Sequence, residues 1–316
     1  MPSATVSGQT GPGGLAAYLA LSRTPHAILD LAGPFCAALL CQGGLPPAWI
    51  ILVGGITVFA GYTAVYALND IVDYRTDRRL VENLGTDGRG GYLDAACIRH
   101  PLAQGCLTLR GAIGWFAAFA VTALIGSWAL NPVCAGLLIF GCLLETAYCL
   151  MLSVSHYRAI INGVVKCLGP LAAAFAVNPA PSPWFLLGLF VWIFSWEIGG
   201  QNIPADWHDA ARDRQTGART VPVVLGPARA GKLALGLLAL SLIWSVPVLA
   251  LSQLAVSTPL WLVAVCGGGV LVLPPAWRLA GRMRDTDAAA LFNRASWYPA
   301  LVLAVLVAVL LVRRFV

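Results

Sequence analysis

Six of the fourteen acidic residues in this sequence form two triplets that share one spacing. Both have the pattern D-x-x-D-x-x-x-D, and their members are Asp70, Asp73 and Asp77, then Asp206, Asp209 and Asp213. At about 100° per residue, offsets of three and seven residues keep all three side chains of a triplet within about 60° of one helical face. Each triplet is therefore predicted to form an acidic stripe along a helix.

Such stripes predict a metal site, because close carboxylates repel one another unless a cation lies between them. Neither triplet has the alternating ligands and central Gly of an EF-hand loop, whereas a few carboxylates together with substrate phosphate oxygens suit Mg²⁺. Basic side chains near the stripes would bind the phosphate. These basic residues are Arg75, Arg78, Arg99, Arg158, Lys166, Arg212, Arg214 and Arg219.

The composition indicates that a membrane positions these residues. Of the 316 residues, 59% are apolar and 11% are charged, whereas about 25% of the residues in a soluble domain are charged. The apolar residues fall into stretches of helical length, which predict an all-α, polytopic bundle with nine transmembrane helices. The stretches are 27–44, 49–69, 111–130, 132–152, 160–178, 184–203, 232–252, 260–279 and 297–315.

These spans occupy nearly the whole chain, so we expect one transmembrane domain over residues 15–316. Residues 1–14 are small, polar and rich in Gly and Pro, and they lack the basic start of a signal peptide. They are predicted to be a disordered tail. Most of the nine cysteines lie in or beside apolar runs, so we expect small buried side chains rather than disulfides or zinc ligands.

The distribution of Lys and Arg predicts the orientation, because short cytoplasmic loops collect basic residues. With a cytoplasmic N-terminus, only Arg313 and Arg314 of the twenty basic residues fall on the outer face. Both acidic stripes then lie on the cytoplasmic side of a bacterial-type inner or plasma membrane. The net charge of +6 is explained by this topology, so we expect no nucleic-acid partner.

An acidic, metal-binding mouth on a bundle embedded in lipid suggests a substrate with a diphosphate head and a long apolar tail, as in a prenyl diphosphate. Mg²⁺ would neutralise the leaving diphosphate while the allylic C–O bond ionises, and aromatic faces in a dry cavity would guide the cation.

Two segments carry a resemblance to a known family. Residues 69–77, N-D-I-V-D-Y-R-T-D, resemble the N-D-x-x-D-x-x-x-D motif of the UbiA superfamily of intramembrane prenyltransferases. Residues 206–226 resemble that family's second D-x-x-x-D segment and its downstream G-x-x-T-x-x-x-x-x-G. The resemblance implies a central cavity open to lipid, Mg²⁺ held by both motifs, and transfer of a prenyl group to a lipid-soluble or aromatic acceptor.

The resemblance also implies residue roles. The metal-binding and catalytic residues would be Asp70, Asp73, Asp77, Asp209 and Asp213, with Asn69 and Asp206 as further metal ligands. The diphosphate would be bound by Arg23, Arg99, Arg158, Lys166 and Arg212. Asn202 stands where part of the family has an acid, so it is expected to orient a ligand or water.

The chain departs from the family pattern at two places. The family usually has Arg directly before Pro-Leu in the loop after the first motif, but here His100 takes that place and Arg99 lies one residue earlier. We expect Arg99 rather than His100 to bind diphosphate. The family also commonly has a Lys shortly after the Tyr that follows the fourth span, whereas here the next Lys is Lys166. Separately, the Gly-rich residues 85–91 suggest a flexible lid.

Three acids within the spans, Asp30, Glu145 and Glu197, must find partners because an isolated charge in hydrocarbon is costly. Glu197 is also a candidate site residue. It precedes Asp206 by nine residues, which places it on the opposite helical face unless Gly199 and Gly200 unwind the helix.

Two further functions remain open from the sequence. A terpene cyclase of the same superfamily would use the same ionisation without an acceptor. A secondary transporter would also be polytopic, but its charged residues should lie near the bilayer midplane, whereas these triplets follow the ends of spans.

Overall fold

The computed structural model describes residues 14–85, 92–93, 98–254 and 258–315. The predicted tail and lid lie outside these residues apart from Gly14 and Gly85. The described part contains helices and no strand. The helices are α1 (Leu15–Leu21), α2 (Thr24–Asp30), α3 (Ala32–Gln42), α4 (Ala48–Leu84), α5 (Leu109–Leu130), α6 (Pro132–Leu150), α7 (Arg158–Val177), α8 (Pro183–Trp196), the π-helical turn η2 (Glu197–Asn202), α9 (Ile203–Thr216), α10 (Val221–Leu225), α11 (Pro227–Leu251), α12 (Thr258–Arg282) and α13 (Asp285–Phe315).

Within this part of the chain, nine helical segments are long and apolar enough to cross a membrane. They are 24–42, 48–83, 109–130, 132–150, 158–177, 183–216, 227–251, 262–282 and 285–312, which confirms the predicted all-α bundle of nine spans. Proline marks several starts, since Pro132, Pro183 and Pro227 each occupy the first turn of a helix, where the missing N–H costs nothing.

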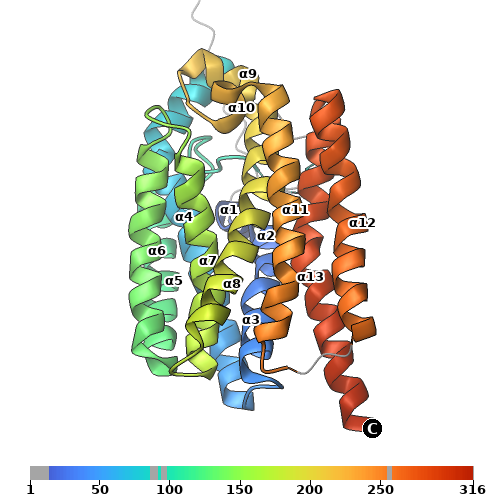
Figure 1. Cartoon of the computed structure of the whole chain (residues 1–316). Coiled ribbons are helices and arrows are strands. Elements are labelled where there is room, and N and C mark those ends of the chain that lie inside the picture. The colour runs from blue at the N-terminus through green and yellow to red at the C-terminus, as the bar shows by residue number, and fades with distance from the viewer. Residues whose placement is uncertain (1–13, 86–91, 94–97, 255–257, 316) are drawn as a thin grey trace, which may run out of the picture.

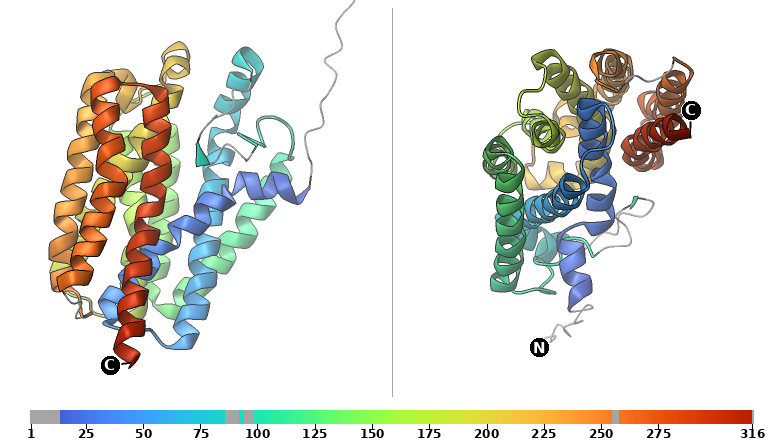
Figure 2. Two further views of the ribbon diagram at one scale, coloured as in Figure 1. Left: turned by 90° about the vertical axis from the view of Figure 1, so that its right-hand side faces the viewer. Right: turned by 90° about the horizontal axis from the view of Figure 1, so that it is seen from below.

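The long helices stand side by side along one axis (Figure 1). α4 packs against α5 and α6, α7 packs against α3 and α6, and α11 packs against α8 and α12. α13 contacts α3, α9 and α12, which brings the C-terminal part of the chain back to the N-terminal part. α9 and α10 lie at one end of the bundle and the C-terminus lies at the other end, as Figures 1 and 2 show.

Both acidic stripes are carried by helices that continue beyond the predicted spans. α4 runs for 37 residues to Leu84, so it extends past the predicted end at residue 69 and carries the whole first triplet. The sixth span continues through η2 into α9, which carries the second triplet and ends at Gly217. A helix that continues past the apolar stretch therefore presents each stripe at the bundle end.

The η2 turn changes the helical phase between Glu197 and Asp206. A π-helical turn is wider than an α-helical one and shifts the residues before it around the axis. A Cβ atom on Gly200 would lie 2.8 Å from Ala295 Cβ, and one on Gly199 would lie 2.8 Å from the Ala234 carbonyl oxygen. The two glycines thus let α11 and α13 pack directly against the turn.

Candidate active site

One cavity of about 610 Å³ lies inside the bundle and receives both acidic stripes. Asp73 and Asp77 from α4 line it, as do the three carboxylates of the second triplet. The remaining acid, Asp70, is only 5% exposed and lies beside His100. The structure therefore brings the two triplets, which are more than 120 residues apart in the sequence, to one site.

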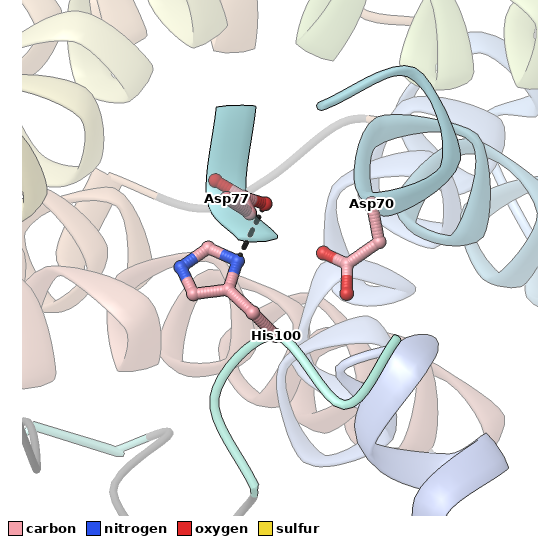
Figure 3. A group of neighbouring side chains, drawn as sticks. All are labelled: Asp70, Asp77 and His100. Atoms are coloured by element: carbon pink, nitrogen blue, oxygen red, sulfur yellow. Dashed lines mark ion pairs between the residues drawn. The ribbon is translucent and has the colours of Figure 1, made fainter. Parts of the chain in front are cut away.

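Arg99 and His100 connect the two stripes. Arg99 Nη2 donates to Asp209 Oδ2 at 2.7 Å, and His100 Nδ1 lies 2.8 Å from Asp77 Oδ2 (Figure 3). Arg99 Nε also donates to His100 Nε2 at 3.2 Å. Two adjacent residues of one loop thus pair with one carboxylate of each stripe, which reduces the repulsion between the acids.

The backbone at His100 has φ of +50°, in the left-handed region that residues other than Gly seldom adopt. Histidine tolerates this region better than branched residues do. Such strain persists where the surrounding structure fixes the conformation, often at a functional site. Here the left-handed conformation directs the Arg99 side chain towards α9 and the His100 side chain towards α4.

The acids fit a hard divalent cation. Five of the six motif carboxylates line one end of the cavity, and Asp70, Asp77 and His100 each offer one ligand atom within 4.8 Å of the others. Oxygen-rich sites with several carboxylates suit Mg²⁺ or Mn²⁺. The predicted ligand Asn69 donates its amide to Glu145 Oε1 at 2.7 Å, which fixes the orientation of the amide at the cavity wall.

The turn after α9 explains the spacing between Gly217 and Thr220 in the second motif. Gly217 has φ of +76° and ends α9. The chain then reverses, so that the Ala218 amide donates to the Asp213 carbonyl at 2.9 Å. Thr220 Oγ1 consequently reaches Asp213 Oδ2 at 3.0 Å and holds this carboxylate in place.

All five side chains predicted to bind diphosphate line the cavity: Arg23, Arg99, Arg158, Lys166 and Arg212. Arg158 is buried, with its guanidinium 3.8 Å from the centre of the Tyr148 ring and its Nε donating to the Tyr148 carbonyl at 3.2 Å. Arg23 lies over the Tyr66 ring. These contacts hold the cations in the wall of the cavity beside the stripes.

Two guanidinium atoms in this wall have no hydrogen-bond partner among the described residues: Arg99 Nη1 and Arg212 Nε. A buried donor without an acceptor is costly. Arg212 is otherwise held by the Gly85 carbonyl at the end of α4. The unpaired N–H groups are therefore suited to an anion such as a phosphate oxygen, which forms short, charge-assisted bonds with guanidinium.

Lys166 belongs to a cluster of buried charged side chains that lies farther along the cavity than the acidic stripes. Lys166 Nζ is 2.6 Å from Asp30 Oδ2 and 3.8 Å from Glu197 Oε2, and Tyr66 donates to Asp30 Oδ2 at 2.5 Å. Lys166 follows Arg158 by eight residues on α7, about 12 Å along the helix axis. A diphosphate contact by Lys166 must therefore compete with these acids, and this role stays a prediction.

The three acids within the spans are all paired, as expected from their burial. Asp30 pairs with Lys166, and Glu145 accepts from Asn69. Glu197 accepts from Asn162 at 3.0 Å and lines the cavity, as Asn202 does. Asp30 and Tyr66 belong to this site but were not singled out from the sequence as site residues, since their partner Lys166 comes from a distant helix.

Comparison with known proteins identifies the family and the fold. The model of the UbiA prenyltransferase family matches residues 31–297. The chain is 25% identical over 274 residues to a 4-hydroxybenzoate octaprenyltransferase of Aliivibrio fischeri (strain MJ11), a match that covers 86% of this chain and 88% of that protein.

Two solved structures have the same fold. A UbiA homologue from Aeropyrum pernix K1, in its apo form, matches with a TM-score of 0.72 and 19% identity over 90% of this chain and 97% of that one. A UbiA homologue from Archaeoglobus fulgidus bound to DMAPP and Mg²⁺ matches with a TM-score of 0.65 and 20% identity over 93% of this chain and 99% of that one.

Proposed function

This chain belongs to the UbiA prenyltransferase family, and from this premise we propose that it transfers a prenyl group from a prenyl diphosphate to a lipid-soluble or aromatic acceptor in a Mg²⁺-dependent reaction. It is an integral membrane protein with nine membrane-spanning helices among its described residues. The observation that carries the proposal is one cavity with carboxylates and guanidinium groups at one end and largely apolar walls beyond them, apart from the buried group around Lys166.

The two stripes are proposed to hold the metal. Asp70, Asp73 and Asp77 act from α4, and Asp206, Asp209 and Asp213 act from α9. When it is bound, Mg²⁺ stabilises the charge that develops on the leaving diphosphate. The homologue from A. fulgidus binds DMAPP and Mg²⁺ together, which supports this assignment.

The cationic side chains bind and orient the diphosphate. Arg99 and Arg212 each have an N–H group without a partner at the cavity wall, and the buried Arg158 adds a fixed positive charge. These groups stabilise the diphosphate as the allylic C–O bond breaks and the electron pair leaves with oxygen. The acceptor then forms a bond to the allylic carbon and releases a proton.

The apolar part of the cavity binds the prenyl tail and excludes water. Its walls include Val58 and Val65 from α4, Leu137 from α6 and Leu168 from α7. A dry cavity protects an allylic cation from hydrolysis. With the stripes on the cytoplasmic face of a bacterial-type inner or plasma membrane, the polar diphosphate head of the substrate reaches the metal end from the aqueous side.

A terpene cyclase is the second candidate. The observation that favours it is Glu197 Oε2, a buried carboxylate oxygen without a hydrogen-bond partner among the described residues, on a side chain that lines the cavity. Such a group is able to take the proton from a cyclised cation. The ammonium group of Lys166, 3.8 Å from this oxygen, opposes a cation there, so the transferase is preferred.

Product analysis distinguishes the two functions. Purified protein is incubated with Mg²⁺ and allylic diphosphates of several chain lengths, with and without aromatic acceptors such as 4-hydroxybenzoate. Prenylated acceptor is expected, with slow hydrolysis alone when no acceptor is present. Cyclic hydrocarbon formed without an acceptor identifies a cyclase, and a protein that leaves every diphosphate intact contradicts both functions.

A further inference from the structure

Three side chains from two segments converge beside the first acidic stripe. Asp70 and Asp77 lie seven residues apart on α4, so they share one helical face, while Asp73 is turned about 60° around the helix axis from Asp70. His100 comes from the loop before α5 and faces the same two carboxylates (Figure 3). One ligand atom of each residue lies within 4.8 Å of the others.

The imidazole of His100 forms an ion pair with Asp77 but no complete hydrogen bond. His100 Nδ1 lies 2.8 Å from Asp77 Oδ2, and within the described part of the chain this buried nitrogen has no partner that satisfies hydrogen-bond geometry. The backbone at His100 is held in the left-handed region, so the ring is fixed against α4 at a conformational cost. A buried nitrogen next to two carboxylates is the arrangement that a metal ion completes.

We propose that His100 is a metal ligand together with Asp70 and Asp77, so that the first motif of this chain forms a mixed nitrogen and oxygen site. The inference rests on the proposed function, which assigns a divalent cation to this stripe. Imidazole favours transition metals, whereas Mg²⁺ prefers oxygen ligands and water. The site should therefore bind Mn²⁺ and Co²⁺ more tightly, relative to Mg²⁺, than a site made of carboxylates alone.

Metal binding by His100 also affects Arg99. A neutral imidazole that binds a metal through Nδ1 carries its proton on Nε2. In this structure Nε2 instead accepts a hydrogen bond from Arg99 Nε at 3.2 Å. The change of tautomer removes this acceptor, so Arg99 Nε becomes available to a phosphate oxygen. His100 thereby couples occupation of the metal site to diphosphate binding by its neighbour.

The alternative is that His100 only neutralises Asp77, and pulsed electron paramagnetic resonance of bound Mn²⁺ separates the two roles. Purified wild-type protein with Mn²⁺ alone is expected to show ¹⁴N modulation from a directly bound imidazole. His100→Gln should abolish this modulation and weaken Mn²⁺ binding by about tenfold or more, while Mg²⁺ binding changes less. His156→Gln, at a histidine that stacks near Tyr157 outside the cavity lining, is the matched control and should keep the signal.

A second variant keeps the test decisive if the glutamine variant folds poorly. His100→Asp replaces nitrogen by oxygen, so it should remove the ¹⁴N modulation and shift the preference from Mn²⁺ towards Mg²⁺. Saturable Mn²⁺ binding without ¹⁴N modulation in the wild type would overturn the role of His100 and leave the proposed function intact. If neither Mn²⁺ nor Mg²⁺ binds to the wild type, both proposals fail.

Discussion

Replacement of Arg99 should weaken the binding of a prenyl diphosphate. Arg99 Nη2 pairs with Asp209 at 2.7 Å, while Nη1 is buried without a partner. Arg99→Ala removes a cation and at least one donor for phosphate oxygens. A hydrogen bond to a charged group contributes about 1.5–3 kcal/mol, so the dissociation constant should rise by about 10- to 100-fold.

Arg99→Lys separates charge from geometry. An ammonium group keeps the positive charge but loses the planar fork that binds two phosphate oxygens. We therefore expect a dissociation constant between those of the wild type and of Arg99→Ala. His100→Ala should weaken diphosphate binding less than Arg99→Ala, because its effect on the diphosphate is indirect.

The assay is the affinity for a non-hydrolysable prenyl diphosphate analogue, measured by calorimetry at saturating Mg²⁺. Arg78→Ala is the matched control, since Arg78 is exposed, bonds to Glu82 at 2.9 Å and does not line the cavity. An Arg99→Ala dissociation constant equal to that of the Arg78→Ala control refutes the assignment. A larger loss for His100→Ala than for Arg99→Ala contradicts the assignment of the principal diphosphate contact to Arg99.

Four further predictions follow from the same site. Asp73→Ala should lower the rate of prenyl transfer by about two decades or more, since loss of metal binding removes several kcal/mol of leaving-group stabilisation, and full turnover of wild-type protein after exhaustive EDTA treatment contradicts the metal requirement. Thr220→Val should lower the rate less, because it keeps the Asp213 carboxylate and removes one hydrogen bond to it, which contributes at most about 1.5–3 kcal/mol; an unchanged rate means that this bond does not position the carboxylate. Gly200→Val should destabilise the fold by about 1–3 kcal/mol and lower the melting temperature, because its Cβ would lie 2.8 Å from Ala295 Cβ; an unaltered melting curve contradicts the close packing. Single cysteines that replace Arg75 and Arg214 should be labelled from the same side of the membrane, and labelling from opposite sides would overturn the shared site.

The sequence alone determined the features that depend on neighbours along the chain. Hydropathy over about 20 residues decides whether a segment crosses a bilayer, so the nine spans were predicted, six of them with both ends within five residues of those observed. Offsets of three and seven residues place side chains on one face of any α-helix. Each acidic stripe was therefore specified by its own spacing once the helix formed.

The sequence underestimated three helices for a physical reason. Hydropathy marks where a helix leaves the apolar layer, and it contains no signal that the helix itself must stop there. α4 continues to Leu84, the sixth span continues through η2 to Thr216, and α13 begins at Asp285 rather than at residue 297. The sequence left open whether Gly199 and Gly200 unwind the helix, and the structure has a π-helical turn there.

Only the tertiary structure decided which distant groups meet. The 2.8 Å contact of His100 with Asp77 depends on how one loop returns across α4, and the pairing of Lys166 with Asp30 joins residues 136 positions apart. Sequence spacing constrains side chains on one helix, but it does not fix the packing of one helix against another. That packing is set by the whole bundle, including the fit of Gly200 against α13, so the acidic stripes were predictable whereas the loop that connects them was not.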